Sequence, residues 1–214
     1  MNYESQFFFL WSGAMTRAAK TNTDIRQEQI ASAALELIGA GGLSGLSIAA
    51  IAERVGIVPS AVYRHYPGKE AVLDAVLELL RVRMLANAEA VRTETPDAVE
   101  RLRLLLIRHM TMLVDNPAFP HVIFAHFSHD DDENRRSVLQ DTMRAYLDEV
   151  TRIIEQGQAA GAIRGDIPPR TAAVMFIGLI LPAAMLHRLS RGGFDAAGHV
   201  NAAWPVFLGG IVKS

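Results

Sequence analysis

The chain has 214 residues, of which 50% are hydrophobic, so it can bury a sizeable core and is not an intrinsically disordered protein over most of its length. Its formal net charge of −2 excludes an overall positive field that would attract nucleic acid or an anionic membrane, so any basic surface must be local. The absence of cysteine excludes disulfides, thiolate metal sites and a catalytic thiol.

The N-terminal segment carries one short apolar run, Phe7–Trp11, which follows Glu4 rather than a basic residue. This run is shorter than the core of a signal peptide, so we expect no secretion signal and a cytoplasmic protein. Residues 1–22 are expected to form a disordered arm. An alternative is that the natural protein starts at Met15 and that the residues before it are an upstream extension.

Three short helices are predicted in the next part of the chain. The first covers Asp24–Ile38 and is ended by glycines at 39, 41 and 42. The second begins after Ser47 as its N-cap and ends at Gly56. The third begins at Pro59, a residue suited to the first helical position, runs through Tyr66 and stops at Pro67–Gly68.

Longer helices are predicted after Gly68. Apolar periodicity marks segments from Lys69 to before Pro96, 99–113, 139 to Gly157 or Gly161, 171–187 and 195–212. No convincing pair of strands is found, so the fold class is all-α. We expect a three-helix head at residues 23–70 and a larger helical bundle at residues 71–214.

The second and third predicted helices, Ser47–Val55 and Pro59–Tyr66, have the proportions of a helix-turn-helix, whose second helix enters the DNA major groove. The spacing of Val62 and Tyr66 would turn both inward and leave Ser60, Ala61, Arg64 and His65 on the outer surface. Residues 1–70 carry no net charge, so this pattern alone is equally compatible with a small structural helical domain.

Two stretches, Ile51–Ile57 and Val62–Val72, resemble the DNA-binding head of TetR-type transcriptional regulators. The resemblance implies a homodimer that binds a near-palindromic operator and represses transcription. It also implies that Ser47, Tyr63, His65 and Lys69 contact the DNA backbone, and that Pro59, Ser60, Ala61 and Arg64 lie nearest the bases. The chain departs from the family pattern at Leu46, Val58 and Ala61, where hydroxyl-bearing residues are common.

The segment 71–214 contains none of the standard catalytic or phosphate-binding motifs, so we expect no enzyme, no cofactor and no metal ion. The alternative hypothesis is a helical metal-dependent enzyme or binding module centred on His121, His126 and His129, which precede a short acidic cluster.

The bundle also supplies candidate ligand-binding residues from several helices. Methionine and aromatic side chains can adapt to a small apolar or amphipathic ligand, and a histidine or tyrosine can fix its orientation. These candidates are His109, Met110, Phe124, Phe127, Met143, Tyr146, Met175 and Phe176. Ordinary core packing is the competing interpretation for each of them.

The uncharged segment Thr171–His187 is barely long enough to cross a membrane and contains Pro182. The TetR resemblance implies instead that Thr171–His187 and Phe194–Val212 pair with their counterparts in a second copy. We therefore expect no membrane partner and a dimeric repressor that a small ligand releases from double-stranded DNA.

Overall fold

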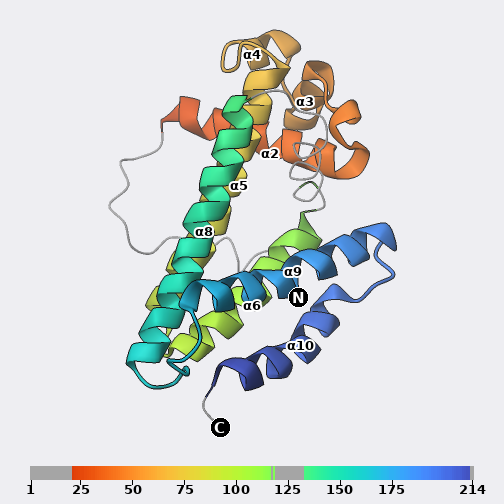
Figure 1. The fold of residues 1–214 in the computed structure, drawn as a ribbon. Coiled ribbons are helices and arrows are strands. Elements are labelled where there is room, and N and C mark those ends of the chain that lie inside the picture. The colour runs from red at the N-terminus through yellow and green to blue at the C-terminus, as the bar shows by residue number, and fades with distance from the viewer. Residues whose placement is uncertain (1–20, 117, 119–132, 213–214) are drawn as a thin grey trace.

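The computed structural model describes residues 21–116, 118 and 133–212 (Figure 1). Phe124, Phe127 and the three histidines of the metal hypothesis lie outside these residues, as does nearly all of the expected N-terminal arm. The elements are α2 (Asn22–Gly41), the 3-10 helix η1 (Leu43–Gly45), α3 (Ile48–Val55), α4 (Pro59–Tyr63), α5 (Lys69–Glu94), α6 (Ala98–Asp115), α8 (Glu133–Ala159), α9 (Pro169–Leu189) and α10 (Ala196–Ile211).

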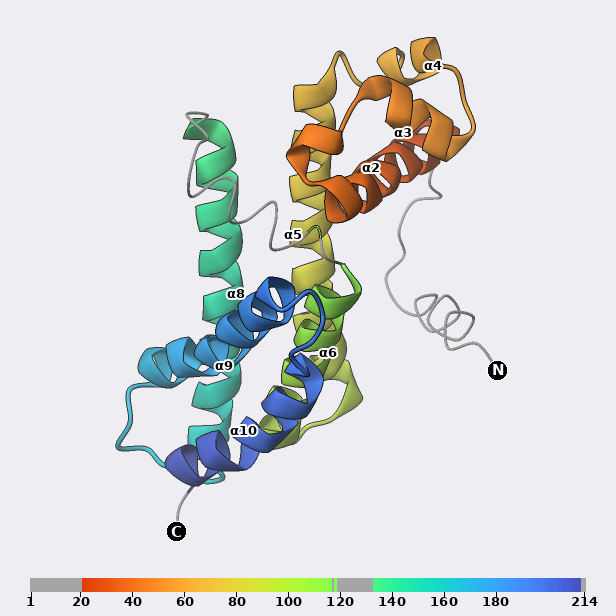
Figure 2. The ribbon, with the colours of Figure 1, turned by 90° about the vertical axis from the view of Figure 1, so that its right-hand side faces the viewer.

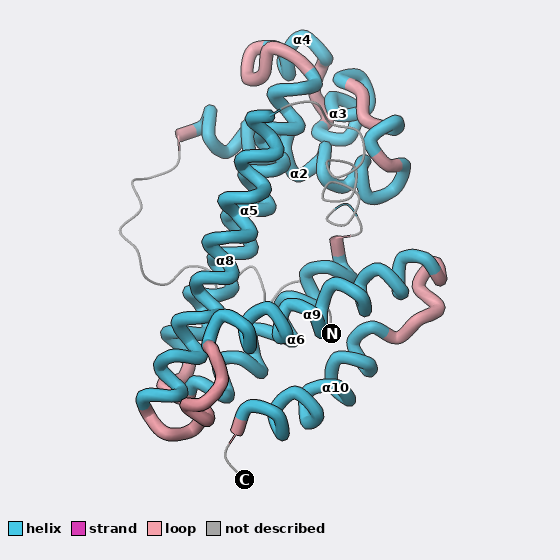
Figure 3. The backbone as a smooth tube through the Cα atoms, in the orientation of Figure 1, coloured by secondary structure: helices cyan, strands magenta, loops and turns pink. Residues whose placement is uncertain are grey.

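The described residues confirm the all-α class (Figure 3). The nearest approach to a strand pair within them is one isolated bridge, in which the Arg164 amide donates to the Ile211 carbonyl at 2.8 Å. Most helix ends fall where capping residues predicted them. Ser47 accepts a hydrogen bond from the Ala50 amide at the start of α3, and Gly56 ends α3 in the left-handed conformation with φ 76°.

Several helix boundaries differ from the prediction, and among them α2 ends at Gly41 rather than Ile38 and α8 begins at Glu133 rather than at 139. α2 begins at Asn22, before the predicted Asp24, because Thr21 and Asp24 form a capping box in which each side chain accepts from the other residue's amide. α4 ends at Tyr63, so Tyr66 lies beyond the helix. The Tyr66 side chain is nevertheless half-buried, and its hydroxyl donates to the Gln27 carbonyl at 3.2 Å.

The head consists of α2, η1, α3 and α4, which pack around Ile30, Ile38, Ile51 and Val62, all fully buried. α5 begins directly after the head and packs against α2 at its N-terminal end (Figure 2). It continues past the head alongside α8 and α6. Because α5 belongs to both parts, the buried residues form one connected core rather than two.

In the body, α8 runs beside α5, α9 crosses α8, and α10 packs against α6 and α9 (Figures 1 and 2). Arg135 of α8 is 6% exposed and pairs with Asp74 at 2.7 Å and with Glu70 at 2.6 Å, both in the first turns of α5. This pair of contacts ties the start of α8 to the part of α5 that adjoins the head.

α9 is long and apolar enough, by length and composition, to cross a membrane. In the fold, 39% of its most apolar stretch is buried, through contacts with α6, α8 and α10. The side chains on its other face remain exposed in the single chain, and they include Val174, Met175, Met185 and Leu186.

Candidate nucleic-acid interface and regulatory body

α3 and α4 are joined by a short turn, Gly56–Val58, as a helix-turn-helix requires. The turn depends on Gly56, whose positive φ is costly for residues with a Cβ atom. α3 packs against α2 and α4 packs against α3, with Ile51, Ala52 and Val62 buried in the core of the head. The surface of α4 is therefore held on a rigid support, with its other side facing solvent.

Ser60 and Tyr63 on the outer surface of α4 are exposed, and so is Arg64, which directly follows the helix. Within the described part of the chain, none of these three side chains makes a hydrogen bond or an ion pair. Their donors are therefore available to an external partner without breaking an internal contact. Arginine can bind phosphate or the edge of guanine, and hydroxyl groups can bind phosphate or bases.

Ala61 is a correction to the sequence-based expectation, because its side chain is 8% exposed and faces the core rather than the outer surface. The following residue, Val62, is also buried, so α4 inserts two consecutive side chains between itself and the rest of the head. Ala61 therefore cannot present its side chain to a base edge in this structure.

Ser47, His65 and Lys69 surround α4 and are already engaged in different ways. The Ser47 oxygen accepts from Ala50, which leaves its hydroxyl hydrogen free to donate. The Lys69 ammonium donates to the Leu43 carbonyl at 3.1 Å and retains two further donors. His65 is half-buried, and its Nδ1 atom is buried without a partner among the described residues, so only Nε2 can reach an external group.

His109 of α6 and Tyr146 of α8 meet inside the body. His109 Nδ1 lies 2.6 Å from the Tyr146 hydroxyl oxygen, and the two rings stack edge to face with centroids 4.9 Å apart. Burial lowers the pKa of His109 to about 4 and raises that of Tyr146, so both groups are uncharged at neutral pH. The pair is a polar but neutral point in an apolar interior.

The other candidate ligand residues in the described ranges do not line one common space. Met110 is buried, and Phe176 packs against Phe207 with ring centroids 5.9 Å apart. Met143 lines a hollow of about 20 Å³ between α5 and α8, room for about one water molecule. Met175 is 60% exposed on the outside of α9 and does not lie in the interior of the bundle.

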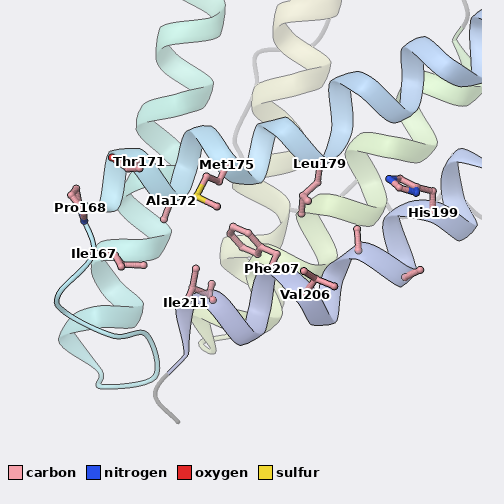
Figure 4. A pocket seen from close by; sticks show the side chains of 13 residues that line it. Ile167, Pro168, Thr171, Ala172, Met175, Leu179, His199, Val206, Phe207 and Ile211 are labelled. Carbon is pink, nitrogen blue, oxygen red and sulfur yellow. The ribbon is translucent and has the colours of Figure 1, made fainter.

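Met175 instead lines a groove of about 540 Å³ between α9 and α10 (Figure 4). Leu179 of α9 and Val206 and Phe207 of α10 also line it, and Val206 is 79% exposed. The groove is almost entirely apolar, with His199 as its one imidazole. Exposed apolar surface of this extent is typical of protein–protein contacts and of ligand-binding grooves.

Comparison with known proteins identifies the family from both parts of the fold. Residues 30–76 match the model for bacterial regulatory proteins of the tetR family, and residues 95–184 match the model for the tetracyclin repressor-like C-terminal domain. Together the two models span more than half of the chain. The chain belongs to the TetR family. It is therefore a DNA-binding transcriptional regulator with a helical regulatory domain, and regulators of this family act as dimers.

Individual relatives cover nearly the whole chain. The nucleoid occlusion factor SlmA of Escherichia coli O1:K1 / APEC is 28% identical over 198 residues, which are 90% of this chain and 96% of SlmA. Among solved structures, the fatty acid degradation regulator FadR from Bacillus halodurans has a TM-score of 0.73 at 20% identity, covering 89% of this chain and 97% of FadR.

SmeT, the repressor of the Stenotrophomonas maltophilia multidrug efflux pump SmeDEF, has a TM-score of 0.70 at 22% identity, covering 91% of this chain and 94% of SmeT. SmeT has also been solved as a complex with triclosan. These structural matches support the fold. The comparisons give no support to the metal-dependent alternative.

Proposed function

We propose that this TetR-family regulator is a cytoplasmic repressor. Two copies bind a near-palindromic operator as a dimer until a small ligand releases them. The observation that carries the DNA-binding part is the exposed, internally unpaired set Ser60 and Tyr63 on α4 and Arg64 directly after it. In this proposal Arg64 and Ser60 read base edges, with Pro59 beside them. Ser47, Tyr63, His65 and Lys69 contact the backbone.

The dimer in this proposal forms through α9 and α10, which correspond to the predicted segments Thr171–His187 and Phe194–Val212. The exposed apolar side chains of the described body gather there, namely Val174, Met175, Leu181, Met185, Leu186, Leu189 and Val206. Gly178 has open space around the position of a Cβ atom, which allows a second helix to approach closely. Association would bury these apolar side chains as a protein core buries its own.

The ligand in this proposal is small, uncharged, and apolar or amphipathic. Arg135 is the buried charged side chain among the described residues, and it is paired at the start of α8. Among the residues that the structure describes, a charged ligand would therefore find no buried counterion near His109 and Tyr146, whereas a neutral polar group could hydrogen-bond to this pair. Ligand binding would favour a conformation of the body in which the two heads of the dimer no longer match operator half-sites about 34–36 Å apart.

The operator claim is tested by titrating the purified protein onto DNA from upstream of its own gene. We expect specific, salt-sensitive binding that the double substitution Arg64→Ala, Tyr63→Phe abolishes. Arg92→Ala is the matched control, because it removes one exposed arginine from the far end of α5. Equal loss with Arg92→Ala, or binding indifferent to the double substitution, would contradict the proposed interface.

Chromosome-wide mapping of bound sites extends this test. A few sites next to promoters are expected for a repressor. Many sites spread along the chromosome would instead favour a role in nucleoid occlusion, the function named for SlmA.

The dimer surface is tested by Val206→Glu, examined by sedimentation equilibrium. Because Val206 is exposed in the single chain, the substitution should leave the fold intact but place a charge inside the interface. We expect a folded monomer. Gln140→Glu adds the same charge on an exposed position of α8 and should remain dimeric. A dimer with Val206→Glu would place the interface elsewhere.

A further inference from the structure

Val58 is an exposed aliphatic residue at the turn before α4. Its side chain is 61% exposed, although valine is usually buried. It occupies the N-cap position but forms no side-chain capping hydrogen bond. The backbone alone holds it, because the Val58 carbonyl accepts from the Ala61 amide at 2.9 Å. The backbone thus fixes the position of the Val58 side chain, and the side chain itself does not cap the helix.

Val58 differs in its surroundings from the other exposed hydrophobic side chains. Most of the exposed large hydrophobic side chains in the described residues lie on α9 and α10, where the proposed dimer would cover them. In the head the aliphatic ones are Ile25, at the start of α2, and Val58. Val58 lies close in sequence to the exposed polar residues Ser60, Tyr63 and Arg64, so an apolar group stands at the edge of a hydrogen-bonding surface.

The chemistry of valine limits what such a group can bind. An isopropyl group neither donates nor accepts a hydrogen bond, so it cannot hold a phosphate or a polar base edge. It gains free energy only by leaving water against another apolar group. In the major groove, the apolar group on the base edges is the 5-methyl of thymine. Residues at the start of the recognition helix are those that contact base edges.

Resting on the proposed operator binding by α4, we propose that Val58 is a specificity-determining residue that packs against the 5-methyl group of one thymine in each operator half-site. Val58 carries no hydrogen-bonding group in its side chain, so the contact that it offers beside Ser60 and Arg64 is apolar. Such a contact favours thymine at one position of each half-site.

The experiment removes the 5-methyl group of thymine and the methyl groups of Val58 separately. The wild-type protein first selects its preferred duplex from a random library. Each thymine is then replaced in turn by deoxyuridine, which lacks only the 5-methyl group, and affinities are measured by gel shift. At one thymine per half-site we expect the wild-type affinity to fall about four-fold, and about fifteen-fold when both half-sites are changed. Val58→Ala should bind the thymine and deoxyuridine duplexes equally.

Ile25→Ala is the matched control, because it shortens the other exposed aliphatic side chain of the head and should keep the wild-type response to deoxyuridine. A melting curve checks that Val58→Ala is folded. If the library yields no preferred duplex, the proposed function fails. If it yields one, the inference is overturned by wild-type indifference to every deoxyuridine, by an unchanged response in Val58→Ala, or by complete loss of binding in folded Val58→Ala.

Discussion

His109 and Tyr146 are hydrogen-bonded to each other in the interior of the body, from α6 and α8, across 37 positions of sequence. Both residues are almost completely buried, at 5% and 1% exposed. Each is therefore the other's means of satisfying a polar atom that has no access to bulk water. In the described residues the pair is the buried polar link between α6 and α8, which are also joined at the surface by Arg101 donating to Gln156 at 2.7 Å.

Replacing Tyr146 by phenylalanine removes the hydroxyl and leaves His109 Nδ1 buried without its partner. We expect the free energy of unfolding to fall by about 1–3 kcal/mol, measured by urea denaturation. Tyr63→Phe removes an exposed hydroxyl and should leave the stability unchanged. Equal stability of Tyr146→Phe and wild type would show that the hydrogen bond adds nothing to the fold.

The stability should fall in acid because of His109. Burial holds its folded-state pKa at about 4, below the ordinary value near 6.5, so the unfolded chain takes up the proton first. This contribution is complete above pH 6.5 and is lost as the pH falls towards 4. Between pH 7 and pH 4.5 we expect the free energy of unfolding of the wild type to fall by about 2–3 kcal/mol through this contribution, and His109→Gln should lack this loss. Parallel pH profiles for the two proteins would contradict this.

Arg135 should matter more to stability than an ordinary surface arginine. Its guanidinium is buried, whereas its partners Glu70 and Asp74 are 67% and 51% exposed. Arg135→Met removes both ion pairs, and we expect a loss of about 1–3 kcal/mol in urea denaturation. Arg144→Met breaks an exposed pair with Asp141 and should cost less than about 0.5 kcal/mol. Equal effects would show that burial does not strengthen the Arg135 contacts.

Gly56 and Gly165 provide a test of backbone conformation alone, since a Cβ atom would meet open space at both. Gly56 has φ 76°, whereas Gly165 is not in the positive-φ region. Gly56→Ala should destabilise the protein by about 1–2 kcal/mol, and Gly165→Ala should have little effect or stabilise it slightly. Thermal denaturation of both variants gives the comparison, and a neutral Gly56→Ala would mean that the turn relaxes.

Local signals predicted the helices well because glycine, proline and capping residues act within a few positions. Ser47, Gly56 and Pro59 each mark a boundary in the structure where the sequence placed it. The division of the chain at residue 70 stays a prediction, since α5 packs against both the head and the body.

Side-chain direction was harder to predict. Ala61 was placed outside on the assumption of a helix reaching Tyr66, but α4 ends at Tyr63. A helix that is apolar all round does not show which of its faces meets the core, so the exposure of Met175 on α9 could not be predicted. The burial of Arg135 depends on Asp74, 61 positions away, and no local pattern announces such a contact.

Both helices of the proposed dimer surface contain an internal proline, Pro182 in α9 and Pro205 in α10. A proline has no N–H to donate to the carbonyl four residues earlier, which here belongs to Gly178 and to Asn201. Both of those residues are exposed. An otherwise apolar contact between subunits would thus carry two main-chain carbonyls that lack their usual helical donor, and water or a donor from the opposite copy can bind them. Such acceptors can select one alignment of the subunits among those that apolar packing alone would tolerate.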